Sequence, residues 1–398
     1  ILDAGDFSFS FVDHGAATFY YVPKLLFQPL RKAEKLVLGQ IEKLKSGDFS
    51  DDLFNAVKLT MIRQHGQDIE SMEDRLFSLI HTFIEYETWE DMIKWPERLE
   101  KVTKEDVVKI SNKYFGDNNL VFNSRMGFPK KHKLKKPSFK PVIPVNSEEE
   151  SVYASRLEAI PENDLDLQFI EFDKDVKYKE ISRNIHLYHS ENPINNIFNL
   201  TLEYGIGNLQ DSRLEQTSEL LDLLGTNSYT FNEFKSELQK IGTKISFDSD
   251  RDYFRIKIKG FDKYFNESLK YADEFITNVK ADDKKIRTLA DNVKAERKQN
   301  DNNPSTIGRA LRDYVNFGNK SYYLRRLTIS EIKKTKSQDY IDSFKRALEY
   351  ELNIFYTGKL ETDIIISSIT ENLSLSNNPI ASYSPVDIEI NKRDKDMV

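Results

Sequence analysis

Residues 198–204 alternate apolar and polar side chains, and this alternation constrains the fold more than any other feature of the chain. A period of two is typical of a strand that buries one face in a core and keeps the other face polar. The same region contains further predicted strands at 176–181, 185–189, 244–248, 253–260 and 353–356. Capped amphipathic helices lie between them. Strands that are followed by runs of helices indicate an α+β fold, with an antiparallel sheet packed against helices.

The first 128 residues resemble an incomplete copy of this arrangement. Residues 7–12 alternate Phe and Ser, which predicts a strand, and Ser50 is a typical N-cap for a helix that follows it. The stretches 103–122 and 337–355 both run from a capped helix through a polar turn to a short apolar strand, at 120–122 in the first case. We therefore predict tandem lobes of one architecture.

Residues 129–146 form a connector between the two lobes. They contain four prolines and six lysines. Proline restricts the backbone to extended conformations and like charges repel one another, so we expect a semi-rigid surface strap rather than part of a core.

The composition favours more than one folded domain and argues against nucleic-acid binding. The chain has 398 residues and a formal net charge of −7, which would not neutralise phosphates. The absence of cysteine excludes disulfides, thiolate nucleophiles and cysteine-ligated zinc. No apolar run is long enough to span a membrane, and the start lacks a signal-peptide pattern. We expect a soluble segment of a longer protein, whose compartment, bacterial periplasm or cytoplasm, stays open.

Familiar catalytic motifs are missing from the sequence. The six histidines include no pair at the i, i+4 spacing that aims two imidazoles at one zinc ion from a helix. His186 and His189 lie in a predicted strand, where three residues of separation place them on opposite faces. Paired carboxylates such as Asp51 and Asp52 stand at predicted helix starts, where the helix dipole explains them. The residues alone therefore indicate no enzyme.

Three stretches of the chain resemble one peptidase family. They are LTLEYGIGNLQ at 200–210, RLEQTSELLDLLGTNS at 213–228 and FxxELxxIGTKISF at 234–247. Together they resemble a lobe of the pitrilysin/insulinase-type metallopeptidases, which carry the inverted zinc motif H-x-x-E-H. The resemblance covers nearly the whole chain, and residues 200–247 are its most specific part.

The resemblance places the family's zinc motif on residues 216–220. Gln216 and Leu220 then stand where the family has its two histidine ligands, and Glu219 stands at the position of the general base. Glu296 is the candidate for the third ligand, a glutamate on a later helix. Because both histidines are missing, the resemblance implies no catalytic residue, no metal site and no cofactor in this chain. Zinc is expected only in a missing N-terminal lobe.

Members of this family contain four similar α+β lobes in two halves joined by a strap, with the fold of LuxS and the processing peptidases. The resemblance implies that this chain starts in the latter part of lobe two and continues through the strap into lobe three, a degenerate copy of the catalytic lobe. It then enters lobe four. The corresponding ranges are 1–128, 129–165, 166–361 and 362–398.

Two functions follow as alternatives from this resemblance. In the first, the chain is the inactive middle part of a zinc endopeptidase, which forms chamber wall, holds peptide substrates and contacts the missing N-terminal catalytic lobe and the C-terminal lobe. In the second, no lobe has a complete zinc site and the protein is a pseudopeptidase scaffold or binding partner. An H-x-x-E-H motif upstream of Ile1 would separate the two. Unrelated α+β domains with a chance match are a third interpretation, which strand order would test.

Overall fold

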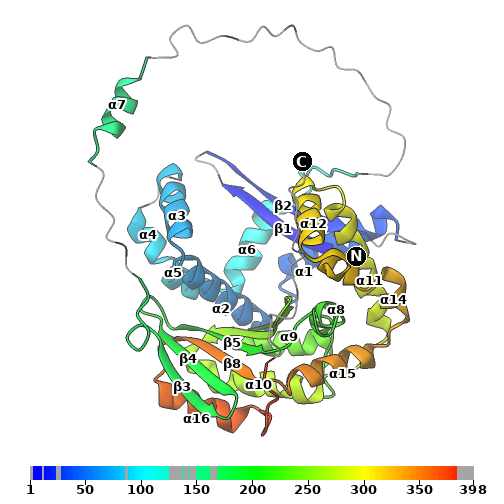
Figure 1. Ribbon diagram of the computed structural model, residues 1–398. Helices are drawn as coiled ribbons and strands as arrows, with labels where there is room; N and C mark the ends of the chain where they lie inside the picture. Colours follow the sequence, from blue (N-terminus) through cyan, green and yellow to red (C-terminus); the bar gives the residue numbers. More distant parts are fainter. Residues whose placement is uncertain are drawn as a thin grey trace. The chain divides into compact units, whose positions relative to one another are not determined.

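The computed structural model describes residues 3–10, 13–23, 28–85, 88–124, 138, 142, 149–161, 167 and 169–382 (Figure 1). Contacts divide the chain into two units, of which the larger joins Ile1–Tyr114 to Glu171–Val398 and the smaller is Phe115–Ile170. Helices together with a six-stranded sheet in the larger unit confirm the α+β class. In the described part of the chain, no helix is both long and apolar enough to cross a membrane.

An antiparallel hairpin opens the chain. Strand β1 (Asp3–Ser10) pairs with β2 (Gly15–Val22) along its whole length. The predicted strand at residues 7–12 is therefore present as far as Ser10, and its last two residues lie outside the described part of the chain. The sequence of β2 lacks a period of two, so the pattern did not predict it.

Among the described residues of 28–114, six helices follow the hairpin. They are α1 Leu30–Ser46, α2 Asp51–Asp68, α3 Met72–Ile84, α4 Trp89–Ile93, α5 Trp95–Lys101 and α6 Lys104–Tyr114. Their ends agree with the capping residues: the Ser50 hydroxyl accepts a hydrogen bond from the Leu53 amide at the start of α2. Thr103 and Asp106 accept hydrogen bonds from each other's backbone amides at the start of α6.

The predicted strand at residues 120–122 is wrong. These residues have no regular structure, and no described strand pairs with them. A short strand is stable only within a sheet, so an apolar triplet after a turn is weak evidence for one. Most of the strap predicted at 129–165 lies outside the described residues, and its described part contains helix α7 (Val152–Glu158).

The second half of the chain builds a six-stranded sheet in the order β3-β4-β8-β5-β7-β6. Its strands are β3 Lys177–Ser182, β4 Ile185–Glu191, β5 Ile197–Tyr204, β6 Lys244–Ser249, β7 Phe254–Phe261 and β8 Leu352–Gly358, so every strand predicted in this region is present. The sheet is antiparallel at four of its five strand pairs, and β4 runs parallel to β8. Most of the helices of the lobe lie between these two strands in sequence, which provides the long crossover that a parallel pair needs.

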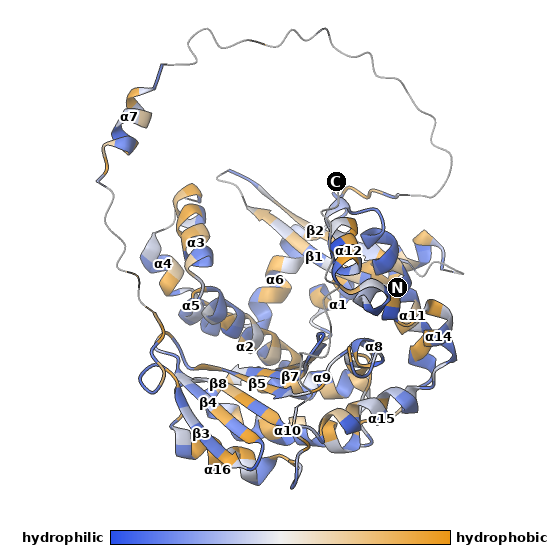
Figure 2. Ribbon diagram, in the orientation of Figure 1, coloured by the Kyte–Doolittle hydropathy of each residue, from blue (hydrophilic) through white to orange (hydrophobic). Residues whose placement is uncertain are grey.

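The hydrophobic core lies on one face of this sheet. The helices of this half are α8 Leu214–Leu221, α9 Phe231–Lys240, η1 Asp262–Tyr264, α10 Phe265–Asn278, α11 Lys284–Asn300, α12 Pro304–Phe317, η2 Gly318–Lys320, α13 Tyr322–Arg325, α14 Ile329–Lys334, α15 Ser337–Ala347 and α16 Thr362–Asn372. Figure 2 shows both apolar and polar residues along β4 and β8. Leu187, Leu200 and Ile354 of neighbouring strands share one buried cluster with Leu269 of α10 and Ile369 of α16. The apolar side chains on the inward face of the strands therefore pack against the helices on one side of the sheet.

Helix α2 packs against α9 and contacts β5. Asn192 and Asn195, in the turn between β4 and β5, each donate a side-chain hydrogen bond to the Oε1 of Glu70, at 2.9 Å and 2.8 Å. Asn195 also donates to the Gly66 carbonyl at 2.9 Å. Asn192 is buried, so these bonds satisfy its amide while they tie the N-terminal helices to the sheet.

Candidate functional site

Helix α8 carries the three residues at the predicted zinc-motif positions. Gln216 and Leu220 are fully buried, with 0% of their surface exposed, and Leu220 belongs to the hydrophobic core. Residues four apart lie one turn apart on the same helical face, so both ligand positions face the interior. Zinc in proteins is bound by Cys, His, Asp or Glu. The amide of Gln216 and the aliphatic side chain of Leu220 are therefore not suitable zinc ligands.

The buried amide of Gln216 has no hydrogen-bond partner. Neither its Oε1 nor its Nε2 meets one among the residues that the structure describes. Water solvates both atoms in the unfolded chain, so their burial without a partner costs free energy. Gln216 therefore destabilises the fold at the position where the resemblance places the family's first ligand.

Glu219 has a perturbed carboxyl group. Burial, and then the neighbouring carboxylates of Glu215 and Glu296, raise the pKa of Glu219 to about 7, while Arg297 opposes this rise. The fold thus brings Glu296 of α11 into the electrostatic environment of Glu219, although the two residues are far apart in sequence. Glu296 is exposed and accepts a hydrogen bond from Asn300 at 3.3 Å. A carboxyl group with this pKa suits proton transfer.

Further polar groups surround α8. Tyr322 of α13 donates a hydrogen bond to the Oε1 of Glu215, and Arg297 donates to the Leu327 carbonyl at 2.7 Å. The Nη2 of Arg297 is buried and, like the Gln216 amide, has no partner among the described residues. Sequence patterns missed this cluster because its members come from three helices.

Metal ligands do not gather elsewhere in the described residues. Within them, no three His, Asp or Glu side chains lie close enough together to hold a metal ion. The absence of a catalytic residue and of zinc stays a prediction, as does the assignment of Gln216, Glu219, Leu220 and Glu296 to the family's motif.

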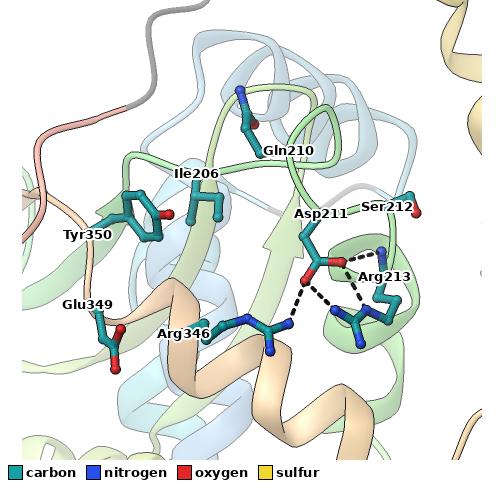
Figure 3. Close-up of a pocket in the computed structure, with 8 residues that line it drawn as sticks. All are labelled: Ile206, Gln210, Asp211, Ser212, Arg213, Arg346, Glu349 and Tyr350. Carbon is teal, nitrogen blue, oxygen red and sulfur yellow. Dashed lines mark hydrogen bonds and ion pairs between the residues drawn. The ribbon is translucent and has the colours of Figure 1, made fainter.

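A pocket of about 460 Å³ lies between the end of β5, the start of α8 and the end of α15 (Figure 3). Asp211 organises it, since it accepts hydrogen bonds from the Nε of Arg213 at 3.1 Å and from the Nη2 of Arg346 at 3.0 Å. Burial by itself would raise the pKa of Asp211, but the hydrogen bonds from Arg213, Ser343 and Arg346 hold it below its ordinary value. The lining residues are Ile206, Gln210, Asp211, Ser212, Arg213, Arg346, Glu349 and Tyr350.

Sequence reasoning missed this pocket. Asp211 and Arg346 are 135 residues apart, so no local spacing predicts that they meet. The one available signal was the Asp211-x-Arg213 pair directly before a helix, where a short polar side chain often bonds to nearby backbone groups. The Oδ1 of Asp211 does accept a hydrogen bond from the Arg213 amide, at 3.1 Å.

The face of the sheet opposite the core exposes a row of aromatic rings. Tyr178 of β3, Tyr188 of β4 and Phe355 of β8 stand opposite one another in register, with successive ring centroids 5.3 Å and 5.1 Å apart. Tyr178 and Phe355 are exposed. His186 lies on this face, with its Nδ1 2.9 Å from the Tyr178 hydroxyl, whereas His189 is buried, which confirms that the two histidines face opposite sides.

Charged residues continue this face across β5, β7 and β6. Arg255 donates to Glu203 at 2.7 Å and to Asp250 at 2.6 Å, and Lys257 donates to Asp248 at 3.1 Å. Rings and paired charges of both signs therefore lie side by side on one sheet face. Such a surface suits a polypeptide with apolar and charged side chains better than it suits a polyanion.

The sequence of this half matches a known family. Residues 217–328 match the model of the insulinase family, peptidase family M16. The match confirms the predicted resemblance to pitrilysin/insulinase-type peptidases. Residues 217–328 are therefore peptidase-like in sequence. No curated protein matches the chain.

Several solved structures match parts of this chain at low sequence identity and low TM-score. The first half of the periplasmic protease PqqL from Escherichia coli is 12% identical with a TM-score of 0.45, over 55% of this chain and 50% of that one. An inactive domain of peptidase M16 from Pseudomonas fluorescens is 13% identical with a TM-score of 0.45, over 52% and 53%. A variant of the ferredoxin protease FusC, in complex with Arabidopsis ferredoxin, is 12% identical with a TM-score of 0.46, over 90% and 42%. This chain thus spans about half the length of the structures that it matches.

Proposed function

We propose that this chain is the non-catalytic middle part of a zinc-dependent endopeptidase, in which it forms part of the wall and of the peptide-binding surface of an enclosed chamber. The proposal rests on the predicted placement of the buried Gln216 and Leu220 at the two histidine positions of the family's zinc motif. A domain that keeps its sheet and helices but cannot hold the metal contributes surface rather than chemistry. The catalytic zinc then belongs to an N-terminal lobe of the same polypeptide.

The exposed face of the sheet supports the binding of peptides. Tyr178, Tyr188 and Phe355 offer stacked rings to apolar side chains of a substrate, and aromatic contacts of this kind dominate many interfaces. Arg255 and Lys257 lie on β7, which β5 separates from the ring-bearing strand β8, next to carboxylates that accept their hydrogen bonds. An extended peptide that crosses the strands would meet both kinds of group, so we expect binding without narrow sequence selectivity.

Helix α3 supports contact with another lobe. Met72, Leu76, Ile80 and Phe83 recur at helical spacing and are all exposed. Four large apolar side chains in one exposed stripe are typical of a surface that packs against a partner. We assign this stripe to the N-terminal catalytic lobe of the same polypeptide.

Fluorescence anisotropy with a short labelled peptide that contains Phe, Lys and Glu tests peptide binding. The double variant Tyr188→Ala/Phe355→Ala should bind the peptide about 5- to 150-fold more weakly, because it loses two aromatic contacts of about 0.5–1.5 kcal/mol each. Tyr314→Ala is the matched control, since Tyr314 is an exposed ring on α12, outside the sheet. Equal binding by wild type and the double variant would contradict the role of the sheet face.

The parent reading frame separates the proposal from a pseudopeptidase scaffold. An upstream H-x-x-E-H motif, together with zinc-dependent peptide cleavage by the whole polypeptide, supports the endopeptidase. A parent protein that binds peptides but has no such motif and no cleavage activity is a scaffold, and the proposal is then wrong.

A further inference from the structure

We infer that the pocket around Asp211 binds a carboxylate group of a peptide, an assignment that rests on the proposed peptide binding. The carboxylate is either the C-terminus of the peptide or the side chain of an Asp or Glu residue. The loop after β5 and the end of α15 supply the lining. Ile206 in the loop and Ala347 at the end of α15 are buried, so the core holds both walls in place.

The two guanidinium groups are held in place without being saturated. Asp211 accepts hydrogen bonds from the Nε and Nη2 of Arg213, but only from the Nη2 of Arg346. Ser343 also accepts from the Nη2 of Arg346, at 3.0 Å. An arginine side chain has five N–H donors. No described residue accepts a hydrogen bond from the Nε or Nη1 of Arg346, so both remain available to a ligand. Half of the Arg346 side chain, 50%, is exposed, which makes these donors accessible.

The charges at the pocket favour an anion. Arg213 and Arg346 carry two positive charges against the two negative charges of Asp211 and Glu349, so the lining as a whole is neutral, and its positive charge is concentrated at the two guanidinium groups around Asp211. Helix α8 begins directly after Arg213, and the positive end of its dipole adds to this potential. The other acidic lining residue, Glu349, directs its carboxylate away from Asp211 in Figure 3. A charge-assisted hydrogen bond from Arg346 to an incoming carboxylate is therefore the favoured interaction.

The remainder of the pocket fits the residue that carries the carboxylate. Ile206 and Tyr350 lie on the opposite side from Arg213 and offer apolar surface (Figure 3). Gln210 accepts a hydrogen bond from the Gly207 amide at 3.1 Å through its Oε1, so its Nε2 is oriented as an additional donor. A volume of about 460 Å³ accommodates one or two residues of a peptide rather than a folded partner.

Three labelled peptides of one parent sequence test this site by fluorescence anisotropy with the full chain. The first ends in a free carboxylate, the second in an amide, and the third is the amide with one internal Gln replaced by Glu. The first or the third should bind at least about tenfold more tightly than the second, and which of them does so identifies the source of the carboxylate. This preference should disappear in Arg346→Gln and decrease in Arg346→Lys.

Arg287→Gln is the matched control, because Arg287 is an arginine of α11 with 76% of its side chain exposed and lies outside the pocket. It should keep the full preference for the carboxylate. Circular dichroism melting curves should be unchanged in Arg346→Gln, because the removed side chain is half exposed and Arg213 still binds Asp211. If that variant does not fold, Arg346→Lys supplies the same comparison.

The amide peptide separates this inference from peptide binding itself. If all three peptides bind equally to wild type and Tyr188→Ala/Phe355→Ala weakens them all, the carboxylate site is refuted while the proposed function stands. If none of the peptides binds to wild type, both are refuted. A preference for the carboxylate that persists in Arg346→Gln also refutes the site, because the preference then arises elsewhere.

Discussion

Replacing Gln216 with leucine should stabilise this protein. Gln216→Leu removes two buried polar atoms that have no hydrogen-bond partner among the described residues, and it keeps a side chain of similar volume. The site lies on α8 within the core, beside residues such as Leu220 and Leu221. The substitution therefore replaces an unsatisfied amide with an aliphatic group in apolar surroundings.

The size of the effect follows from the amide. An amide that is buried without a compensating hydrogen bond costs about 1–3 kcal/mol in mutational data. Leucine avoids this cost, and an imperfect fit of its branched end would reduce the gain. We therefore expect the free energy of unfolding to rise by about 1–3 kcal/mol in Gln216→Leu.

The reverse substitution one turn along the helix is the matched control. Leu220 is as fully buried as Gln216, but its surroundings suit an aliphatic side chain. Leu220→Gln should lower the free energy of unfolding by about 2–5 kcal/mol, because it loses apolar packing and buries an amide. The free energy of unfolding should thus rise when position 216 becomes apolar and fall when position 220 becomes polar.

Urea titration followed by circular dichroism measures both effects. A shift of the midpoint at a constant slope reports a change in stability rather than in the denatured state. Gln216→Leu should move the midpoint up and Leu220→Gln should move it down. A lower midpoint for Gln216→Leu would refute the reasoning, because the amide would then be hydrogen-bonded in the folded protein.

Three further predictions concern other parts of the structure. Glu219 has a folded pKa of about 7 against an ordinary 4.5, so its contribution to stability is lost as the pH rises through this interval. Between pH 4.5 and above pH 7, the free energy of unfolding of the wild type should fall by up to about 3 kcal/mol because of Glu219, and Glu219→Gln should remove this fall. An unchanged pH profile in urea titrations of the variant would contradict this. The wild-type chain should hold no stoichiometric zinc after dialysis, whereas Gln216→His/Leu220→His should bind zinc weakly in calorimetric titration. Adding Glu296→Ala should weaken that binding and adding Glu219→Ala should not, and indifference to Glu296 would mean that the motif was placed on the wrong residues. Glu70→Ala removes the acceptor of two hydrogen bonds from Asn192 and Asn195 and should cost about 1–3 kcal/mol, while the exposed Glu73→Ala should leave the urea midpoint unchanged.

Local patterns in the sequence determined most elements of the second half of the chain. The alternation in residues 198–204 predicts β5 because a strand with one buried face needs only a period of two. Ser50 and Thr103 predict the starts of α2 and α6 because a cap satisfies the amides of its own first turn. The pattern failed at 120–122, since a strand requires a neighbour that the triplet cannot specify.

For the candidate sites too, the sequence predicted some features and only the structure showed the others. The resemblance of residues 200–247 to a peptidase lobe already showed that Gln216 and Leu220 cannot bind zinc as histidines do. It could not show that the Gln216 amide is buried without a partner, because burial depends on the elements packed around α8. It also could not show that Glu296 perturbs Glu219.

Only the tertiary structure decided which distant residues meet. Asp211 and Arg346 form their ion pair across 135 residues, and β4 pairs with β8 in parallel after most of the helices of the lobe have intervened. Each of these contacts forms because the packing of helices on one face of the sheet brings two segments to the same place. Periodicity and capping describe interactions within one or two turns, so they determine the elements, whereas the energy of the buried core determines how the elements come together.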